Sequence, residues 1–411
     1  MIKSRCSIGV IGGSIAGLLV ALVLRRKGCE VNVFERSEAE LATRGAGITP
    51  HQPLFEAFKQ ADIEIKDAMG VRSRGRLFLA RNGLIDDRNE TPQLFTSWGL
   101  LYRFLRKALP NDKHHNGATL TSIESNESTI RAAFSNGATH TFDWLIGADG
   151  ARSPVRNAVA PHLQLRYNGY VAWRGLLDES RLSEDIAAQL NDRMTFYLPP
   201  GEHMLGYTVA GPNDSLIRGQ RWYNWVWYRP VASGQDYASM FTDARGAYHI
   251  EGIPPPLIRA DVLARMRADA KRLLPPQFRA VVGSTQQPFL QPITELGSDK
   301  MVYNRAVLIG DAAFTVRPHI GLGVSKAADD AATLAQVFSQ PCEDIGRALL
   351  EWETSRMAFG NAALQRSADL GCYLGNDAES ADEIRRHEYF RRSDVVLTGI
   401  AAADPHQFLQ L

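Results

Sequence analysis

Three short stretches of the chain place small or acidic residues directly after an apolar run that favours a β-strand. The first, "VIGGSIAG", carries Gly12, Ser14 and Gly17 in the spacing of a nucleotide-binding turn, with serine in the position where the middle glycine is usual. The others are "LIGADG", with Asp149, and "LIGDA", with Asp311. Glycines let a phosphate approach the backbone, and carboxylates accept hydrogen bonds from hydroxyl groups. These residue types therefore indicate a dinucleotide site.

The first stretch has the pattern of a βαβ unit. Residues 7–11 are apolar, residues 15–28 have helical periodicity, and residues 30–36 alternate like a strand. The amino end of the helix would offer free N–H groups and a partial positive charge to phosphates, and the small Ser14 could donate its hydroxyl. Glu35 at the end of the second strand would accept from ribose hydroxyls and repel a 2′-phosphate, which argues against NADP in this turn.

The two aspartates follow strand patterns in the same way. In an open parallel sheet, ligands bind at the carboxyl ends of the strands, which is where Asp149 and Asp311 would lie. Either residue alone would be an ordinary turn residue, because Asp and Gly both favour turns. Three such sites in one chain favour a shared ligand.

The length, composition and net charge of the chain limit the class of protein. With 411 residues the chain is long enough for two domains, and 45% hydrophobic residues with a net charge of +1 favour a globular protein without nucleic acid as a partner. Four cysteines without a C-x-x-C pair predict neither a disulfide framework nor a zinc site, and favour a cytoplasmic location. Glycines interrupt the apolar run at residues 8–24, so we predict no signal peptide and no membrane association.

Jointly, the motifs resemble those of the flavin-dependent aromatic hydroxylases, single-component FAD monooxygenases related to p-hydroxybenzoate hydroxylase, over residues 5–360. The stretches "VIGGSIAG", "GYVAWRGLL" and "RPHIGLGVSKAADDAATLAQVF" look like the subgroup of 2,6-dihydroxypyridine 3-hydroxylase, which shares the serine. The resemblance implies that the first motif binds the ADP half of FAD and that Asp311 binds the ribityl chain. The stretch with Asp149, Ser153 and Arg156 would lie near the pyrophosphate and serve both FAD and NAD(P)H.

The resemblance also implies which residues contact FAD. They lie in the three motifs, in the loop "RGAGITPH" and in the helix "LLYRFLRKALP", and are Gly12, Gly13, Ser14, Ile15, Ala16, Gly17, Glu35, Arg36, Gly47, Arg103, Asp149, Gly150, Gly310, Asp311, Pro318, Gly321, Leu322 and Gly323. Backbone N–H groups of residues 321–323 would reach the flavin pyrimidine ring. Arg103 could instead face solvent, since Arg106 and Lys107 are close by.

The elements that must position these residues fall into two kinds. Residues 193–211 and 220–231 alternate and are rich in aromatic and β-branched residues, which predicts an antiparallel sheet. We therefore expect an α/β fold, with a Rossmann-like FAD/NAD(P)-binding domain, an inserted antiparallel-sheet substrate domain and C-terminal helices. The expected FAD domain comprises residues 1–72, 98–168 and 288–350, the substrate domain 73–97 and 169–287, and the C-terminal segment 351–411.

The resemblance implies a reaction. NAD(P)H would reduce FAD, and reduced FAD would add O₂ to give a C4a-hydroperoxide that attacks an electron-rich ring carbon. A base of near-neutral pKa would help by deprotonating a ring hydroxyl, and His51 in the flavin loop is the candidate. Tyr207, Tyr228 and Trp225 could line the substrate chamber, although aromatics at strand spacing are also typical of a core.

Two further residues near the motifs could take either a site role or a structural one. We expect His319 to pack at the isoalloxazine ring without proton chemistry. We expect Arg174 to form a structural salt bridge, the alternatives being contact with an acidic substrate or with the flavin.

Several alternatives stay open from the sequence. "WVWYRP" differs by one residue from the W-x-W-x-I-P signature of flavin-dependent halogenases, but the comparable loop lacks their lysine. A non-catalytic FAD-binding protein is the other alternative. A single fingerprint favours transient NADH or NADPH binding beside tightly bound FAD. The substrate could be a hydroxylated pyridine, a phenol, a salicylate-like acid or a urate-like purine, and a homodimer is possible.

Overall fold

The computed structural model describes residues 6–39, 41, 47–64, 69–340, 345–375 and 378–401. One half of the molecule, referred to as the first half, is built on a six-stranded sheet. Its strand order is β18-β19-β12-β1-β2-β8, and all neighbours except β18 and β19 run parallel. The strands are β1 (Ser7–Ile11), β2 (Glu30–Phe34), β8 (His114–His115), β12 (Trp144–Gly147), β18 (Val302–Tyr303) and β19 (Ala306–Leu308). The carboxyl ends of β19, β12, β1 and β2 therefore meet at one edge.

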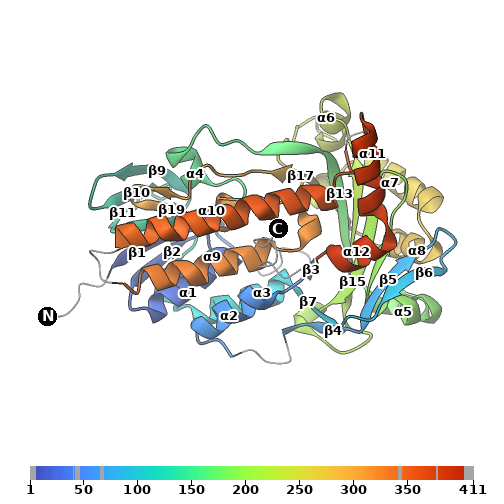
Figure 1. Cartoon of the computed structure of the whole chain (residues 1–411), viewed down its shortest axis with the longest axis horizontal. Coiled ribbons are helices and arrows are strands. Elements are labelled where there is room, and N and C mark those ends of the chain that lie inside the picture. The colour runs from blue at the N-terminus through green and yellow to red at the C-terminus, as the bar shows by residue number, and fades with distance from the viewer. Residues whose placement is uncertain are drawn as a thin grey trace.

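Helices cover this sheet. They are α1 (Ile15–Arg26), α2 (Gln52–Gln60), α3 (Trp98–Ala108), α4 (Pro154–Val159), α9 (Gly323–Val337) and α10 (Ile345–Leu370). Figure 1 shows the long α10 lying along α9, with α1 and α2 beside them. Nine of the twelve residues of α1 are buried, because an apolar helix on a parallel sheet has little polar face to offer solvent. A small antiparallel sheet of β9 (Leu120–Ser125), β10 (Ile130–Phe134) and β11 (Thr139–Phe142) extends this half.

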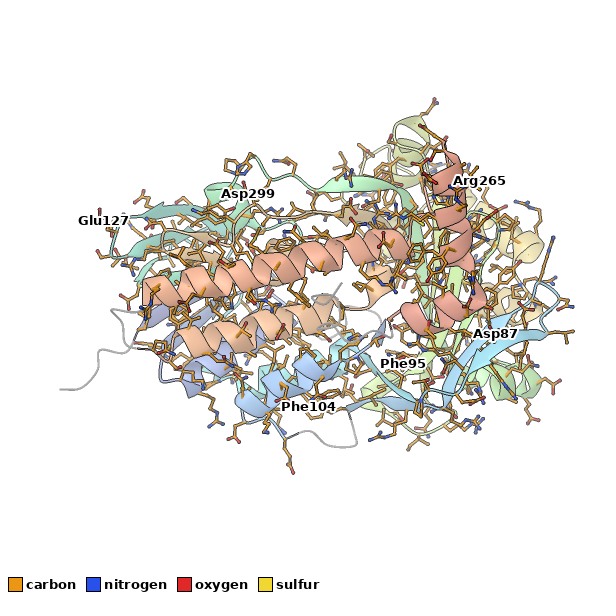
Figure 2. The ribbon with its side chains drawn as sticks, viewed as in Figure 1. Asp87, Phe95, Phe104, Glu127, Arg265 and Asp299 are labelled. Atoms are coloured by element: carbon orange, nitrogen blue, oxygen red, sulfur yellow. The ribbon has the colours of Figure 1, made fainter. Side chains whose placement is uncertain are left out.

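The second half is a seven-stranded sheet in the order β17-β13-β16-β15-β14-β5-β6, antiparallel except between β14 and β5. Its strands are β5 (Gly75–Leu79), β6 (Ile85–Asn89), β13 (Arg166–Asp178), β14 (Arg193–Tyr197), β15 (His203–Val209), β16 (Trp222–Pro230) and β17 (Phe289–Glu295). Helices α5 (Glu184–Leu190), α6 (Gln235–Phe241), α7 (Ala260–Leu273) and α8 (Pro276–Ser284) belong to the same half. Figure 2 labels Glu127 in the first half and Asp87 in the second half, at opposite ends of the view.

The period of two along these strands separates the two faces of the sheet. Trp173, Trp225 and Trp227 pack into a core with residues of α7 and α8. Their neighbours Val226 and Tyr228 belong to a different core that faces the first half of the molecule. A one-residue shift in register would exchange the two sets, so the apolar pattern fixes which side chains reach the junction.

Short elements close the junction. The strands β3 (Gly47–Ile48), β4 (Val71–Ser73) and β7 (Gln93–Ser97) form a three-stranded sheet in the order β3-β7-β4. Phe95 of β7, labelled in Figure 2, stacks on Tyr207 with ring centroids 4.4 Å apart. The helix α12 (Ser393–Gly399) packs against β5 and β6 of the seven-stranded sheet, and α11 (Ala381–Arg391) packs against α12 (Figure 1).

The predicted fold class is confirmed: a mixed α/β protein with a largely parallel sheet of the Rossmann-like kind, an antiparallel sheet and C-terminal helices. Within the described ranges, no helix is both long and apolar enough to cross a membrane.

Candidate active site

The turn between β1 and α1 depends on its glycines. Gly12 has φ of +105°, and a Cβ there would lie 2.5 Å from the carbonyl oxygen of Ala148. A Cβ on Gly17 would overlap the carbonyl oxygen of Gly12. Side chains at either position would push the turn away from the sheet, so these residues keep the start of α1 close to the carboxyl edge.

Glu35 and Ser14 occupy the positions that the sequence indicated. The buried carboxylate of Glu35 accepts from the backbone N–H of Gly13 at 2.8 Å and from that of Ser37 at 2.9 Å. Each oxygen keeps a lone pair for a ribose hydroxyl. Ser14 is the N-cap residue of α1, yet its side chain makes no capping hydrogen bond, which leaves the hydroxyl available to a phosphate.

Asp149 follows β12, and only one of its two carboxylate oxygens has a hydrogen-bond partner among the described residues. Its Oδ2 accepts from the N–H of Val155 at 3.0 Å, whereas its buried Oδ1 has no partner among the described residues. Burial raises the pKa of this carboxyl to about 6, although Ser153 and Arg156 act in the opposite direction. A buried acceptor without a donor is costly and is a common sign of a ligand-binding position.

Asp311 follows β19 and borders the central cavity. Its carboxylate makes no hydrogen bond to a described residue, and burial raises its pKa, while the positive charge of Lys326 opposes that rise. Gly310, with φ of +61°, donates its N–H to Asp330 at 2.9 Å. Arg356 of α10 binds Asp330 at 2.8 Å, so a buried ion pair fixes the loop that presents Asp311.

The loop before α9 completes this side. Pro318 and Gly321 line the cavity, and Gly321 adopts φ of +68°. A Cβ at Gly321 would lie 2.6 Å from the Cβ of Ala401. Leu322 is buried, and Gly323 begins α9. The backbone of this loop thus lies at the cavity wall.

The cavity lies between the two halves and has a volume of about 290 Å³. One wall comes from the nucleotide-binding half, with Gly47, Asp311, Pro318 and Gly321. The other comes from the cavity-facing side of the antiparallel sheet, with Arg174, Leu205, Tyr207, Val226, Tyr228 and Ile293. The segment after α12 also contributes, through Ile400 and Ala401.

The two predicted tyrosines both line this cavity. Tyr207 lies on β15 and Tyr228 on β16, and neither hydroxyl hydrogen-bonds to a described residue. Burial raises the pKa of both phenols, and the nearby positive charge of Arg174 opposes this only in part. They are therefore protonated near neutral pH and can donate hydrogen bonds, but they are poor bases.

Arg174 corrects an expectation. We expected a structural salt bridge, but across the described ranges this arginine has no carboxylate partner and no hydrogen bond. Another arginine on the same cavity, Arg317, does have one, since its Nε binds Glu295 at 2.7 Å. Sequence alone could not separate these two arginines, because the carboxylate partner comes from a distant strand.

His319, which we expected to pack at the isoalloxazine ring, is held by protein contacts at the edge of the cavity. Its Nε2 shares a hydrogen bond of 2.9 Å with the hydroxyl of Tyr170, and its ring packs on Tyr228 with centroids 4.4 Å apart. Although the residue borders the cavity, it is only 1% exposed, so its ring packs against protein. Burial holds the pKa of this imidazole well below its usual range, and it stays neutral.

Two other candidates lie outside the cavity lining. His51 begins α2, and its backbone N and ring Nδ1 each lie 3.2 Å from the Oγ of Ser325. Arg103 forms an ion pair with Asp214. Residues 44–46 of the predicted flavin loop are outside the described residues.

Trp225 packs in the core on the opposite face of the sheet, where its Nε1 donates to Thr285 at 2.9 Å. Trp227, the other tryptophan of the halogenase-like stretch, is equally buried and donates to Glu202. Neither tryptophan borders the cavity.

Sequence reasoning missed the part played by the C-terminal segment. The buried Arg76 of β5 donates to the carbonyl oxygens of Leu397 at 3.1 Å and Ile400 at 2.7 Å. The N–H of Ala401 donates to the carbonyl oxygen of His319 at 3.0 Å. These bonds place the segment against the loop before α9, and no local motif around residue 400 signals this.

The arrangement fits a flavin dinucleotide. Hydroxyl-binding carboxylates are available at Glu35 and Asp311, an unsatisfied acceptor at Asp149, and backbone donors at the start of α1. A ring at the end of this series would face the central cavity. To the ring of a substrate beside it, the cavity would offer hydrogen-bond donors and apolar side chains.

Comparisons with known proteins agree with this geometry. Residues 167–295 match the family described as FAD binding domain-like. The chain is 33% identical over 370 residues to 2,6-dihydroxypyridine 3-monooxygenase of Paenarthrobacter nicotinovorans, covering 89% of this chain and 91% of that protein. It is 26% identical over 370 residues to the FAD-dependent urate hydroxylase of Klebsiella pneumoniae, covering 84% and 85% of the two chains.

Solved structures give the same result. The structure of 2,6-dihydroxypyridine-3-hydroxylase from Arthrobacter nicotinovorans matches with a TM-score of 0.85 and 31% identity, over 93% of this chain and 96% of the other. A Klebsiella pneumoniae protein solved with FAD and uric acid matches with a TM-score of 0.74 over 97% and 98% of the two chains, although identity is only 22%. The second match supports the fold alone.

Proposed function

Because this chain belongs to the FAD-dependent monooxygenases that hydroxylate small aromatic rings, we propose that its own substrate is a hydroxylated pyridine or a closely similar N-heteroaromatic ring. The proposal rests on one observation: Arg174, Tyr207 and Tyr228 line one wall of the cavity that Asp311 also borders. These side chains offer donors to the oxygens of a small ring. The relative that acts on 2,6-dihydroxypyridine supports this ring class.

The proposed FAD contacts follow the carboxyl edge of the parallel sheet. The turn at Gly12–Gly17 would hold the phosphates, Glu35 the adenosine ribose and Asp311 the ribityl chain. Backbone groups of residues 321–323 would meet the flavin ring. When bound, FAD supplies the redox chemistry that links NAD(P)H to O₂.

The protein's own part is to bind and orient the substrate ring. Leu205, Val226 and Ile293 supply an apolar surface that excludes water from the ring faces. The hydroxyls of Tyr207 and Tyr228 donate to ring oxygens and so fix which carbon faces the oxidant.

NAD(P)H would reach the same region only transiently. A groove next to the cavity is lined by Arg36, Arg152 and Arg156 and by Tyr167 and Tyr237. It adjoins the cavity at Ala151 and Gln291. Guanidinium groups bind phosphates and aromatic rings stack on nucleobases, which supports this groove as the docking site. The choice between NADH and NADPH stays a prediction to be tested, as do a cytoplasmic location and a homodimer.

The test is a substrate panel with the purified holoenzyme. NADH and NADPH oxidation would be followed with 2,6-dihydroxypyridine, 6-hydroxynicotinate, salicylate, 4-hydroxybenzoate and urate. We expect a hydroxypyridine to stimulate oxidation most and to gain one oxygen atom by mass. Stronger stimulation by salicylate or urate would reject the proposed ring class. Flavin binding without stimulation by any ring would favour a non-catalytic role.

A further inference from the structure

Lys326, near the start of α9, is a buried lysine to which the proposed function gives no role. It is 1% exposed, and among the described lysines it is the only buried one. Its Nζ has no hydrogen-bond partner and forms no ion pair with a described residue. Because an ammonium group without a partner is costly to bury, an apolar side chain would be more favourable for packing alone. The position therefore requires an electrostatic explanation.

Three carboxylates lie on α9 or next to it. Asp329 and Asp330 belong to the helix, and both bind Arg356 of α10, at 2.7 Å and 2.8 Å. The helix α10 lies along α9 (Figure 1). The third carboxylate, Asp311, lies in the turn that packs on α9, where the N–H of Gly310 donates to Asp330 at 2.9 Å. Two carboxylates thus share the one guanidinium, and Asp311 has no ion pair with a described residue.

The ammonium of Lys326 interacts with Asp311 without direct contact. Burial lowers the pKa of Lys326, and the carboxylates of Asp330 and Asp311 oppose that change. Burial raises the pKa of Asp311, the charge of Lys326 opposes that rise, and Asp330 adds to it. Charges several ångströms apart still interact in a protein interior, where little water screens them. Lys326 is therefore the cation that offsets the desolvation of Asp311.

Other charged and titratable groups face these two residues. Arg156 of α4 donates to the carbonyl oxygen of Ala312 at 3.1 Å, and Asp149 at the adjoining strand end has a pKa of about 6. His51 of α2 lies 3.2 Å from the hydroxyl of Ser325. Across the cavity from Asp311 lie Arg174, Tyr207, Tyr228, Arg317 and His319. A substitution at Lys326 changes none of these groups, so the effect of this lysine can be measured by comparison with the wild type.

We propose that Lys326 is the internal counter-charge of Asp311, and that it keeps this carboxylate ionised so that it accepts hydrogen bonds from the ribityl hydroxyls of FAD. The inference rests on the ribityl contact in the proposed function and gives a positioning role to a residue outside the cavity lining. An ionised carboxylate accepts with both oxygens, whereas a protonated one has become a donor at one of them. Hydrogen bonds to a charged acceptor are also about twice as strong as neutral ones.

The test is FAD binding to the flavin-free full chain from pH 5.5 to pH 9, followed by flavin fluorescence. Lys326→Met removes the charge and keeps an unbranched side chain. We expect the affinity of this variant to begin falling about one pH unit higher than that of the wild type, which makes binding about tenfold weaker on the acid side. At pH 9 the two affinities should agree within about twofold, because Asp311 is then ionised in both. Lys271→Met, an exposed lysine of α7, is the matched control.

Two further variants separate an electrostatic role from a structural one. Lys326→Arg keeps the charge and should titrate like the wild type. In Asp311→Asn, which has no carboxylate to protonate, adding Lys326→Met should leave the pH profile unchanged. Proton release on FAD binding at pH 7, measured with an indicator dye in weak buffer, should be greater for Lys326→Met than for the wild type, because binding favours the ionised carboxylate.

Two outcomes would overturn the assignment. An affinity that falls by the same factor at every pH in Lys326→Met would make this lysine a cofactor contact or a packing residue. A profile identical to that of the wild type would leave Lys326 without influence on Asp311. If Lys326→Met fails to fold, Lys326→Gln decides the matter by the same titration.

The failures of the two proposals can be told apart. If Asp311→Asn binds FAD as tightly as the wild type at pH 8, the ribityl contact of the proposed function is wrong, and the role of Lys326 falls with it. If Asp311→Asn weakens FAD binding while Lys326→Met leaves the profile in place, only the counter-charge is wrong.

Discussion

The two walls of the central cavity present opposite chemistry. The nucleotide-binding wall offers an acceptor in the carboxylate of Asp311, and the same edge of the parallel sheet carries the carboxylate of Glu35 beyond the cavity. The antiparallel wall offers donors, with Arg174, Tyr207 and Tyr228 on neighbouring strands. A cofactor rich in hydroxyl groups needs acceptors, whereas an oxygenated ring needs donors. The polarity of each wall thus indicates what it binds.

The two walls also differ in how they are held. The nucleotide-binding wall depends on backbone geometry, through glycines at positions where a Cβ would collide. The antiparallel wall depends on side chains that alternate along strands, so single substitutions should alter binding there without disturbing the fold. Damage to one wall should therefore leave binding of the other wall's ligand unaffected.

The largest effect is expected at Gly17. In Gly17→Ala the new Cβ would overlap the carbonyl oxygen of Gly12, so the turn must open and FAD should be lost on purification. Flavin content per protein and circular dichroism would measure this. Gly283→Ala is the control, because nothing lies within 4 Å of its added Cβ. Full flavin content in folded Gly17→Ala would show that the turn does not hold the cofactor.

The second-largest effect is expected at Asp311. Asp311→Ala removes an acceptor for flavin hydroxyls, and a charged hydrogen bond is worth about 1.5–3 kcal/mol, so the FAD dissociation constant should rise about 10- to 100-fold. Because the pKa of Asp311 is raised, wild-type FAD affinity should fall as acid protonates it, beginning above the usual range for Asp. Fluorescence titration from pH 8 to pH 5 would show both. An affinity independent of this residue would remove it from the ribityl site.

The phenols should have a smaller effect, confined to the substrate. Tyr207→Phe and Tyr228→Phe each remove one neutral donor worth about 1 kcal/mol, so ring affinity should fall about fivefold while FAD affinity is unchanged. Equilibrium titration of each variant with 2,6-dihydroxypyridine and with FAD separates the two. If either variant weakened FAD more than the ring, the division between the walls would be wrong.

The last prediction concerns the stability of the flavin-free protein at Asp149, not ligand binding. Its pKa of about 6 in the folded protein exceeds the ordinary 3.8, so ionisation costs free energy and stability falls as pH rises from about 4 to 6. Flavin-free Asp149→Asn should be more stable than the wild type at pH 8 by up to about 3 kcal/mol, and the difference should vanish below pH 4. Urea unfolding at both pH values measures it. Equal stability of the variant and the wild type at pH 8 would show that the ionised carboxylate of Asp149 does not destabilise the folded protein.

The nucleotide-binding wall was largely predictable because its chemistry is contiguous in sequence. Gly12, Ser14 and Gly17 lie in one turn, and each aspartate follows its strand directly. The family resemblance drawn from these motifs is confirmed by the 33% identical relative. The individual FAD contacts stay predictions.

The antiparallel wall was less predictable because its residues are far apart in sequence and join only through strand pairing. Tyr207 and Tyr228 were identified as candidates, yet Trp225, on the same strand as Tyr228, points to the opposite face. Arg174 was expected in a salt bridge, since most arginines near a fold's core have a partner. Only the register of β13 and β16 places it on the cavity without one.

The most direct test of the account compares 2,6-dihydroxypyridine with 2,6-dimethoxypyridine under ¹⁸O₂. The two rings share their skeleton, but only the first carries the free ring hydroxyl groups of the proposed substrate class. The account predicts that NAD(P)H oxidation with the dihydroxy ring places one ¹⁸O atom in the product, while the dimethoxy ring gains none. Equal labelling of both rings, or oxidation that yields only hydrogen peroxide with the dihydroxy ring, would contradict it.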